Sequence, residues 1–210
     1  MRGRRFYRVI RDFHLYLGLL SSPFVLVFAI SVFFLVHAWL PKIGSETSTT
    51  RVVSALPLPV NLQTLSGRPL IDALKATLEQ ADVHGEVGFI RHMVKEEKLI
   101  IPVMIPGRET IVTINIPSSE ATIVTRERGL ADAMATLHRS PGEHAPAIRM
   151  NWFYMQAWRW LADTTAYLIL FISVSGIYLW YVLRAERRVG FVLLFAGALS
   201  LLGLAYALSH

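Results

Sequence analysis

The sequence predicts an α+β membrane protein with three transmembrane α-helices and a small domain that combines a helix with an antiparallel sheet. Three observations support this prediction. Long uncharged apolar runs occur near both ends of the chain, arginines cluster beside these runs, and a helix-then-strands pattern fills the middle. Of the 210 residues, 53% are hydrophobic and only 17% are charged, a composition too apolar for an ordinary soluble domain.

The net charge of +6 could indicate nucleic-acid binding, but the placement of the arginines favours a membrane orientation instead. Five arginines lie within the first eleven residues, and three more are Arg184, Arg187 and Arg188. Basic clusters beside apolar helices mark the cytoplasmic side of a membrane. We therefore expect a cytoplasmic N-terminus, the lipid bilayer as a partner and no nucleic acid. The chain has no cysteine, which excludes disulfides, thiol catalysis and cysteine-ligated metals.

The first apolar run, residues 14–40, follows a basic segment at 1–13 and predicts the first transmembrane helix. Between His14 and His37 lie 22 residues without a charge. As a helix they extend about 33 Å, which matches the hydrocarbon thickness of a bilayer. Pro23 lies inside this run and can bend the helix.

The middle of the chain predicts a linker and then a small α+β domain. Residues 41–67 are rich in Ser, Thr and Pro, which predicts an extended linker. Within 68–128, apolar residues spaced three and four apart predict an amphipathic helix at 69–80. Strand-like runs separated by turn residues predict an antiparallel meander with this helix on one face. These runs are 86–94, 99–105, 109–116 and 121–125.

The last third of the chain predicts a return to the membrane. Residues 129–159 hold a short amphipathic helix followed by an aromatic segment typical of a membrane interface. Two further uncharged runs predict the second and third transmembrane helices, at 160–183 and 189–210, joined by a basic cytoplasmic loop at 184–188.

The histidines are the side chains that suggest chemistry. His14 and His37 are about 34 Å apart along one helix, so they cannot ligate the same iron. His138 lies on the apolar face of the short helix before the second span, where we expect it to approach His37. Two facing imidazoles in an apolar pocket are what b-type haem requires. His144 and His210 are weaker candidates for the same site. For each histidine, a structural or interfacial role is the alternative.

Three short stretches resemble the PepSY-associated transmembrane-helix family. The opening His14-Leu15-Tyr16-Leu17-Gly18 resembles its H-x-x-x-G motif, Leu137-His138 resembles a later L-H segment, and Ser175-Gly176-Ile177-Tyr178-Leu179-Trp180 resembles its closing T-G-x-x-L-W motif. The middle of the chain is similar to a small PepSY-type domain. This chain departs from the pattern at Ser175, which replaces a threonine, and at Ala29-Ile30-Ser31, where a T-G is usual. It also has three predicted spans where reductase-like members have more.

The resemblance implies a multi-pass protein of the bacterial cytoplasmic (inner) membrane with a periplasmic main domain. In some members the family carries b-type haem and reduces ferric siderophores. Carried over, His14 and His138 are the matching positions. The first hypothesis is therefore a haem b protein that passes electrons to a periplasmic acceptor such as a ferric chelate. Its haem iron would be held by His37 and His138, with His144 as a substitute and His14 receiving electrons at the inner face.

No catalytic side chain is predicted, so the choice between a reductase and an electron-transfer subunit stays open. Aromatic residues at Trp39, Trp152 and Phe153 are expected to wall the haem pocket. The alternative is a membrane-anchored periplasmic binding or regulatory module without redox chemistry, in which the histidines are structural. Either function allows a partner subunit or a homo-oligomer.

Overall fold

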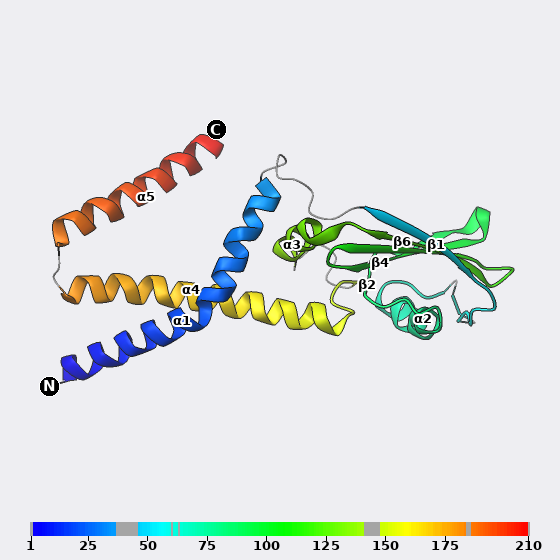
Figure 1. The fold of residues 1–210 in the computed structure, drawn as a ribbon, viewed down its shortest axis with the longest axis horizontal. Helices are drawn as coiled ribbons and strands as arrows, with labels where there is room; N and C mark the ends of the chain where they lie inside the picture. Colours follow the sequence, from blue (N-terminus) through cyan, green and yellow to red (C-terminus); the bar gives the residue numbers. More distant parts are fainter. Residues whose placement is uncertain are drawn as a thin grey trace. The chain divides into compact units, whose positions relative to one another are not determined.

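The computed structural model describes residues 2–36, 46–59, 61–62, 64–140, 148–183 and 186–209 (Figure 1). The chain divides into two compact units. The first unit, which we call the membrane-helix unit, comprises Met1–Val25 and Thr164–His210. The second, the domain unit, comprises Leu26–Asp163. Two long helices contribute to both units, because α1 (Arg2–Val36) and α4 (Phe153–Leu183) each continue across a unit boundary.

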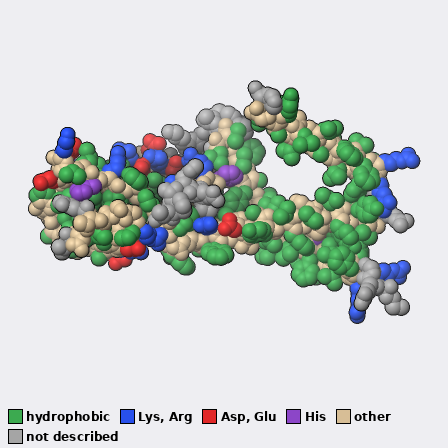
Figure 2. Space-filling view, turned by 180° about the vertical axis from the view of Figure 1, so that it is seen from behind, with side chains coloured by type: hydrophobic (Ala, Val, Ile, Leu, Met, Phe, Trp, Pro, Cys, Tyr) green, Lys and Arg blue, Asp and Glu red, His purple; other side chains and the backbone are tan. Residues whose placement is uncertain are grey.

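In the described part of the chain, three helices are long and apolar enough to cross a membrane. They are α1, over Arg4–Phe33, α4, and α5 (Arg187–Ser209), which agrees with the three predicted spans. On the face drawn in Figure 2, hydrophobic side chains cover these helices. Both α1 and α4 begin earlier than the apolar runs alone indicate. The basic segment before the first apolar run and the aromatic segment before the second contain no proline, and arginine is a good helix former. Both segments therefore continue the helices towards the N-terminus.

The sheet domain, which we define as residues 47–127, contains six strands, β1 (Thr47–Val53), β2 (Glu86–Val87), β3 (Arg91–Met93), β4 (Lys98–Ile105), β5 (Arg108–Asn115) and β6 (Glu120–Glu127). They form one antiparallel sheet in the order β1-β6-β5-β4-β2, with β3 also paired to β4. Its central strands β4, β5 and β6 form the predicted meander. A short 3₁₀ helix, η1 (Val94–Glu96), connects β3 to β4.

One face of the sheet packs against α2 (Arg68–Gln80), as the periodicity predicts (Figure 1). Leu74 of α2 and Ile101, Val112 and Ile123 of the sheet are completely buried between the two layers. Burial of a side chain of this size contributes about 1.5–3 kcal/mol relative to exposure. The sheet domain therefore has an apolar core of its own.

The predicted linker contains a strand that the sequence does not reveal. β1 pairs with β6 along its whole length, from Thr47 opposite Glu127 to Val53 opposite Ala121. Six of its seven side chains are exposed, so the strand lacks the apolar alternation that identifies a half-buried strand. Backbone pairing to β6, rather than burial, places β1 in the sheet.

The first predicted strand-like run divides into β2 and β3 because of a β-bulge. Between the pairs Val87–Val103 and Arg91–Ile100, β4 has one residue fewer than the opposing chain. The N–H of Gly88 donates to the carbonyl oxygen of Pro102 at 2.7 Å. Proline has no N–H with which to continue the ladder, so the pairing shifts at this point.

The helix predicted before the second span is α3 (Gly129–Arg139). From Phe153 onwards, the aromatic segment that follows forms the first turns of α4.

Candidate functional site

Two of the predicted ligand histidines lie in the part of the chain that the structure describes. His14 lies in α1 within the membrane-helix unit, and His138 lies in α3 within the domain unit. His37 and His144 lie outside the described residues, as does His210. The predicted pairing of His37 with His138 at a haem iron therefore stays a prediction. Each of the two described imidazoles contacts a buried serine.

The first imidazole–serine pair joins α1 to α4 inside the membrane-helix unit. Nδ1 of His14 lies 2.8 Å from Oγ of Ser175, whose side chain is 4% exposed. The neighbouring Gly176 faces the imidazole, since a Cβ at this position would lie in van der Waals contact, 3.4 Å from Cε1 of His14. Gly18 lies one turn after His14 on the same face of α1, and a Cβ there would meet no atom of another element within 4 Å.

The second imidazole–serine pair joins α3 to the end of α1 inside the domain unit. Nδ1 of His138 lies 2.7 Å from Oγ of Ser31, whose side chain is 3% exposed. The ring of Phe28 meets the imidazole edge-on, with centroids 5.8 Å apart, and also lies 5.5 Å from the ring of Trp158. His138 thus has a polar partner at one nitrogen and aromatic carbon beside it.

The end of α3 is also attached to α4. Nε1 of Trp158 donates to the carbonyl oxygens of Leu137, at 3.0 Å, and Ser140, at 3.2 Å. Two of the carbonyl groups near the helix end thereby gain a partner. Because the side chain of His138 contacts α1, the C-terminal turn of α3 is bonded to both membrane helices of the domain unit.

The hydrogen bonds of the two serines define which imidazole nitrogen carries the proton. Each serine hydroxyl lies within bonding distance of the carbonyl oxygen three residues earlier in its own helix, at 2.7 Å for Ser31 and 3.2 Å for Ser175. A hydroxyl has one hydrogen and a carbonyl can only accept. Both contacts are satisfied when the serine donates to the carbonyl and accepts from the imidazole N–H. We therefore assign a proton to Nδ1 of both histidines.

When the ring is neutral, a proton on Nδ1 leaves Nε2 as the nitrogen with a free lone pair. A neutral imidazole whose Nδ1–H is held by an oxygen is the usual form of a histidine that binds a metal or haem iron through Nε2. Both His14 and His138 are partly exposed. The residues present thus fit an axial-ligand role. In the described residues, no group of three or more His, Asp or Glu side chains could hold a bare metal ion.

The serine partners of the histidines are absent from the sequence-based prediction. A signal was available, since both serines stand where the chain departs from the threonine-glycine pattern of the family it resembles. Of the aromatic residues expected to wall a haem pocket, Trp39 lies outside the described residues, and the expected role of Trp152 and Phe153 stays a prediction. Trp152 and Phe153 contact the ring of Tyr154, with centroids 5.0 and 5.6 Å away, while Phe28 is the ring beside His138.

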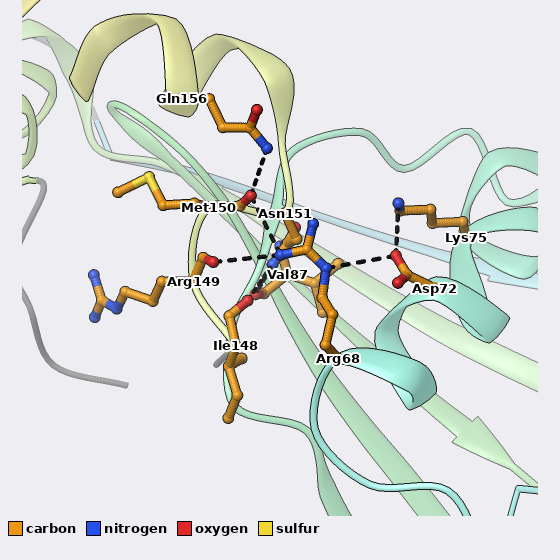
Figure 3. A network of polar contacts seen from close by, with 9 residues as sticks. All are labelled: Arg68, Asp72, Lys75, Val87, Ile148, Arg149, Met150, Asn151 and Gln156. Carbon is orange, nitrogen blue, oxygen red and sulfur yellow. Dashed lines mark hydrogen bonds and ion pairs between the residues drawn. The ribbon is translucent and has the colours of Figure 1, made fainter. Parts of the chain in front are cut away.

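A separate polar network fastens α4 to the sheet domain (Figure 3). Asn151 pairs with the backbone of Val87, accepting from its N–H at 2.9 Å and donating to its carbonyl at 2.7 Å. Arg68 of α2 donates to the carbonyl of Met150 at 3.3 Å. Arg68 also forms an ion pair with Asp72 at 3.6 Å. These contacts determine where the chain leaves the sheet and enters α4.

Glu86 is the buried charged residue of this junction. Its side chain is 7% exposed, and Oε1 accepts from the backbone N–H of Met150 at 3.3 Å. Oε2 is buried without a hydrogen-bond partner among the described residues. Burial raises the pKa of Glu86, and the hydrogen bond from Met150 and the charges of Arg149 and Arg68 offset this only in part.

The chain matches one family of known proteins over almost its entire length. The model of the family described as "Putative PepSY_TM-like" matches residues 6–209. No curated protein and no solved structure matches the chain. The chain therefore belongs to the putative PepSY_TM-like family of membrane proteins.

Proposed function

We propose that this protein is a membrane electron carrier in which His14 and His138 each offer Nε2 as an axial ligand to b-type haem. The observation that carries this proposal is the repeated imidazole–serine geometry. Two histidines in different helices each direct Nδ1 to a buried serine oxygen, at 2.8 and 2.7 Å. A histidine with only a packing role needs no such uniform arrangement.

The serines orient the imidazoles in this proposal. Ser31 and Ser175 hold the Nδ1–H and thereby prevent rotation of each ring and protonation at the wrong nitrogen. Phe28 places aromatic carbon beside His138, and Trp158 packs against Phe28. When bound, b-type haem supplies one-electron chemistry, with a potential that depends on its axial ligands and on burial.

Each haem iron in this proposal has a second axial ligand. His37 and His144 are our proposed partners for His138. For His14, the proposed source is a second copy of the chain, because within the described residues of the membrane-helix unit His14 is the only histidine. The proposal therefore includes a homo-oligomer.

The membrane and its orientation follow from the arginines. We propose the bacterial cytoplasmic membrane, with the basic N-terminus inside and the sheet domain in the periplasm, because five arginines lie within the first eleven residues. Electrons would then leave the protein towards a periplasmic acceptor such as a ferric chelate.

A haemin titration of the full-length protein in detergent tests the haem ligands. Wild type is compared with His14→Ala, His138→Ala and the matched control His84→Ala, whose histidine is exposed and lies 3.3 Å from the carboxylate of Asp82. We expect each ligand variant to lose one binding event or at least tenfold in affinity, and the control to match wild type. An unchanged titration in the His14→Ala/His138→Ala double variant would refute the proposal.

One observation favours the alternative function, a binding module without redox chemistry. β1 lies at the edge of the sheet, and among the described strands it pairs only with β6. Its outer edge can accept a strand from another protein. Co-purification of a stable partner that persists in the double histidine variant would support this function, and loss of that partner on removing the imidazoles would count against it.

A further inference from the structure

A cavity lined by arginines lies beside α3 in the domain unit. Its volume is about 400 Å³, and we call it the arginine cavity after the four arginines in its wall. Polar residues of α3 form one side of it, and the ends of β4 and β5 form another. The arginines are Arg108, Arg128, Arg139 and Arg149.

The arginine cavity has an excess of positive charge. Its wall contains two carboxylates, Glu109 and Asp132, against the four arginines, a formal balance of +2. Glu109 is engaged by Arg128 in an ion pair. Within the wall, Asp132 is then the remaining carboxylate for the other three arginines, and just outside it Glu86 interacts with Arg149 and Glu127 lies opposite Arg108 in the sheet. Arg139 donates from Nε to the carbonyl of Ala135 at 3.2 Å, which holds its guanidinium against α3.

The position of the arginine cavity along the membrane follows from its neighbours in the domain unit. Arg139 follows His138, whose side chain bonds to Ser31 inside the apolar span of α1. Ser140, another wall residue, accepts from Trp158 of α4 at 3.2 Å. Arg149 lies four residues before α4 begins at Phe153. The cavity thus lies where two spans end, which is the depth of the lipid headgroups.

We infer that the arginine cavity binds the phosphate of an anionic membrane phospholipid in the leaflet on the side of the sheet domain. Guanidinium groups match phosphate oxygens in a fork, so several arginines in one wall favour a phosphate over a neutral headgroup. A volume of about 400 Å³ accommodates a headgroup. Basic residues at this depth are attracted to anionic lipids. The inference does not depend on haem.

The consequence concerns the end of α3. A bound headgroup would hold the helix turn that carries His138 against the bilayer surface, in addition to its contacts with α1 and α4. The site would thereby connect lipid composition to the placement of the imidazole.

Native mass spectrometry of the full-length protein in neutral detergent tests the inference. Wild type is mixed with phosphatidylglycerol, phosphatidylcholine or inorganic phosphate. It is compared with Arg139→Gln/Arg149→Gln and with the matched control Arg91→Gln/Lys95→Gln, which removes the same charge from exposed residues outside the cavity wall.

We expect wild type and the control to retain phosphatidylglycerol but not phosphatidylcholine, and the cavity variant to lose at least tenfold in phosphatidylglycerol retention. Equal retention of both lipids, an equal loss in the control, or unchanged retention in the cavity variant would overturn the inference. So would inorganic phosphate that binds as tightly as the lipid, since the ligand would then be a free anion.

A second measurement leaves the protein unmodified, in case the cavity variant does not fold. A phosphatidylglycerol carrying a photoreactive headgroup is cross-linked to wild type in detergent, with unlabelled phosphatidylglycerol as competitor. We expect competed cross-links in the peptides that contain Arg139 and Arg149. Cross-links confined to other peptides would contradict the site.

Discussion

The contacts that stabilise the sheet domain differ in kind from those that join the membrane helices to one another. In the sheet domain, Leu74 and Ile101 are fully buried in an apolar core. In α5 no described residue is buried, and the specific contacts of α1 include the polar pairs of His14 with Ser175 and of Ser31 with His138. Lipid tails are as apolar as leucine, so apolar burial cannot specify how helices pair. The polar pairs add directional contacts between particular helices, and they contain the two imidazoles of our proposed haem site.

The largest predicted effect is a loss of stability when the core of the sheet domain is truncated. Ile101→Ala should lower the free energy of unfolding of this domain by about 2–5 kcal/mol, because it removes a fully buried side chain and leaves a cavity. Amide hydrogen exchange over β4 and β5 in the detergent-solubilised protein measures the loss. The neighbouring Ile100→Ala, on the opposite face and only half-buried, should cost clearly less. Equal losses would show that the core does not hold the domain.

The next effect tests the junction between the sheet domain and α4. Asn151→Ala leaves both backbone groups of Val87 without the partner shown in Figure 3, which costs about 1–3 kcal/mol for buried polar groups. We expect faster amide exchange at Val87 than in wild type. Gln156→Ala, an exposed residue with one bond to Met150, serves as the control and should leave that exchange unchanged. Unchanged exchange at Val87 in Asn151→Ala would show that Asn151 does not hold the junction.

A smaller effect distinguishes polar pairing of the membrane helices from packing. Ser31→Ala and Ser175→Ala should each destabilise the helix contacts by about 0.6–2 kcal/mol. They should also change the ¹⁵N chemical shifts of the paired imidazole, because the Nδ1–H tautomer is no longer favoured. Ser173→Ala is the matched control, since its exposed hydroxyl donates to the carbonyl of Ile169 within its own helix. Imidazole ¹⁵N chemical shifts that are unchanged in both Ser31→Ala and Ser175→Ala would contradict the assigned proton at Nδ1.

The smallest predicted effect is on how the stability of the sheet domain changes with pH. Burial raises the pKa of Glu86 in the folded protein, so the folded state holds this proton more tightly than the unfolded state does. The stability contributed by protonated Glu86 is complete below the unfolded pKa, about 4.3, and is lost as the pH rises through the folded pKa. Glu86→Gln should abolish this loss.

Chemical unfolding of the sheet domain between acidic and neutral pH measures that difference. The exposed Glu79→Gln on α2 is the control and should retain the pH dependence of wild type. A Glu86→Gln protein with the same pH dependence as wild type would show that the buried carboxyl does not titrate in this range.

The sequence predicts those features that depend on apolar periodicity. The three long helices, the helix around Leu74 and the meander of β4 to β6 each show a period that matches their burial. The sequence does not predict β1, because its position depends on backbone pairing with β6 and its side chains show no apolar alternation. The division of the strand after Val87 depends on the proline of a neighbouring strand, which local sequence does not reveal.

The candidate site is predictable only in part, for a related reason. Residue type and family resemblance identify His14 and His138. Their serine partners lie 161 and 107 residues away in the chain, beyond the reach of any local pattern. Only the tertiary contacts show that both imidazoles are held in the same way.

The central claim is that these two imidazoles ligate haem, and the reduced-minus-oxidised absorption spectrum of the full-length protein from haem-replete cells tests it most directly. We predict a b-type spectrum in wild type and in His84→Ala, and its loss in His14→Ala/His138→Ala. A colourless wild-type protein, or a b-type spectrum that survives the loss of both imidazoles, would contradict the claim.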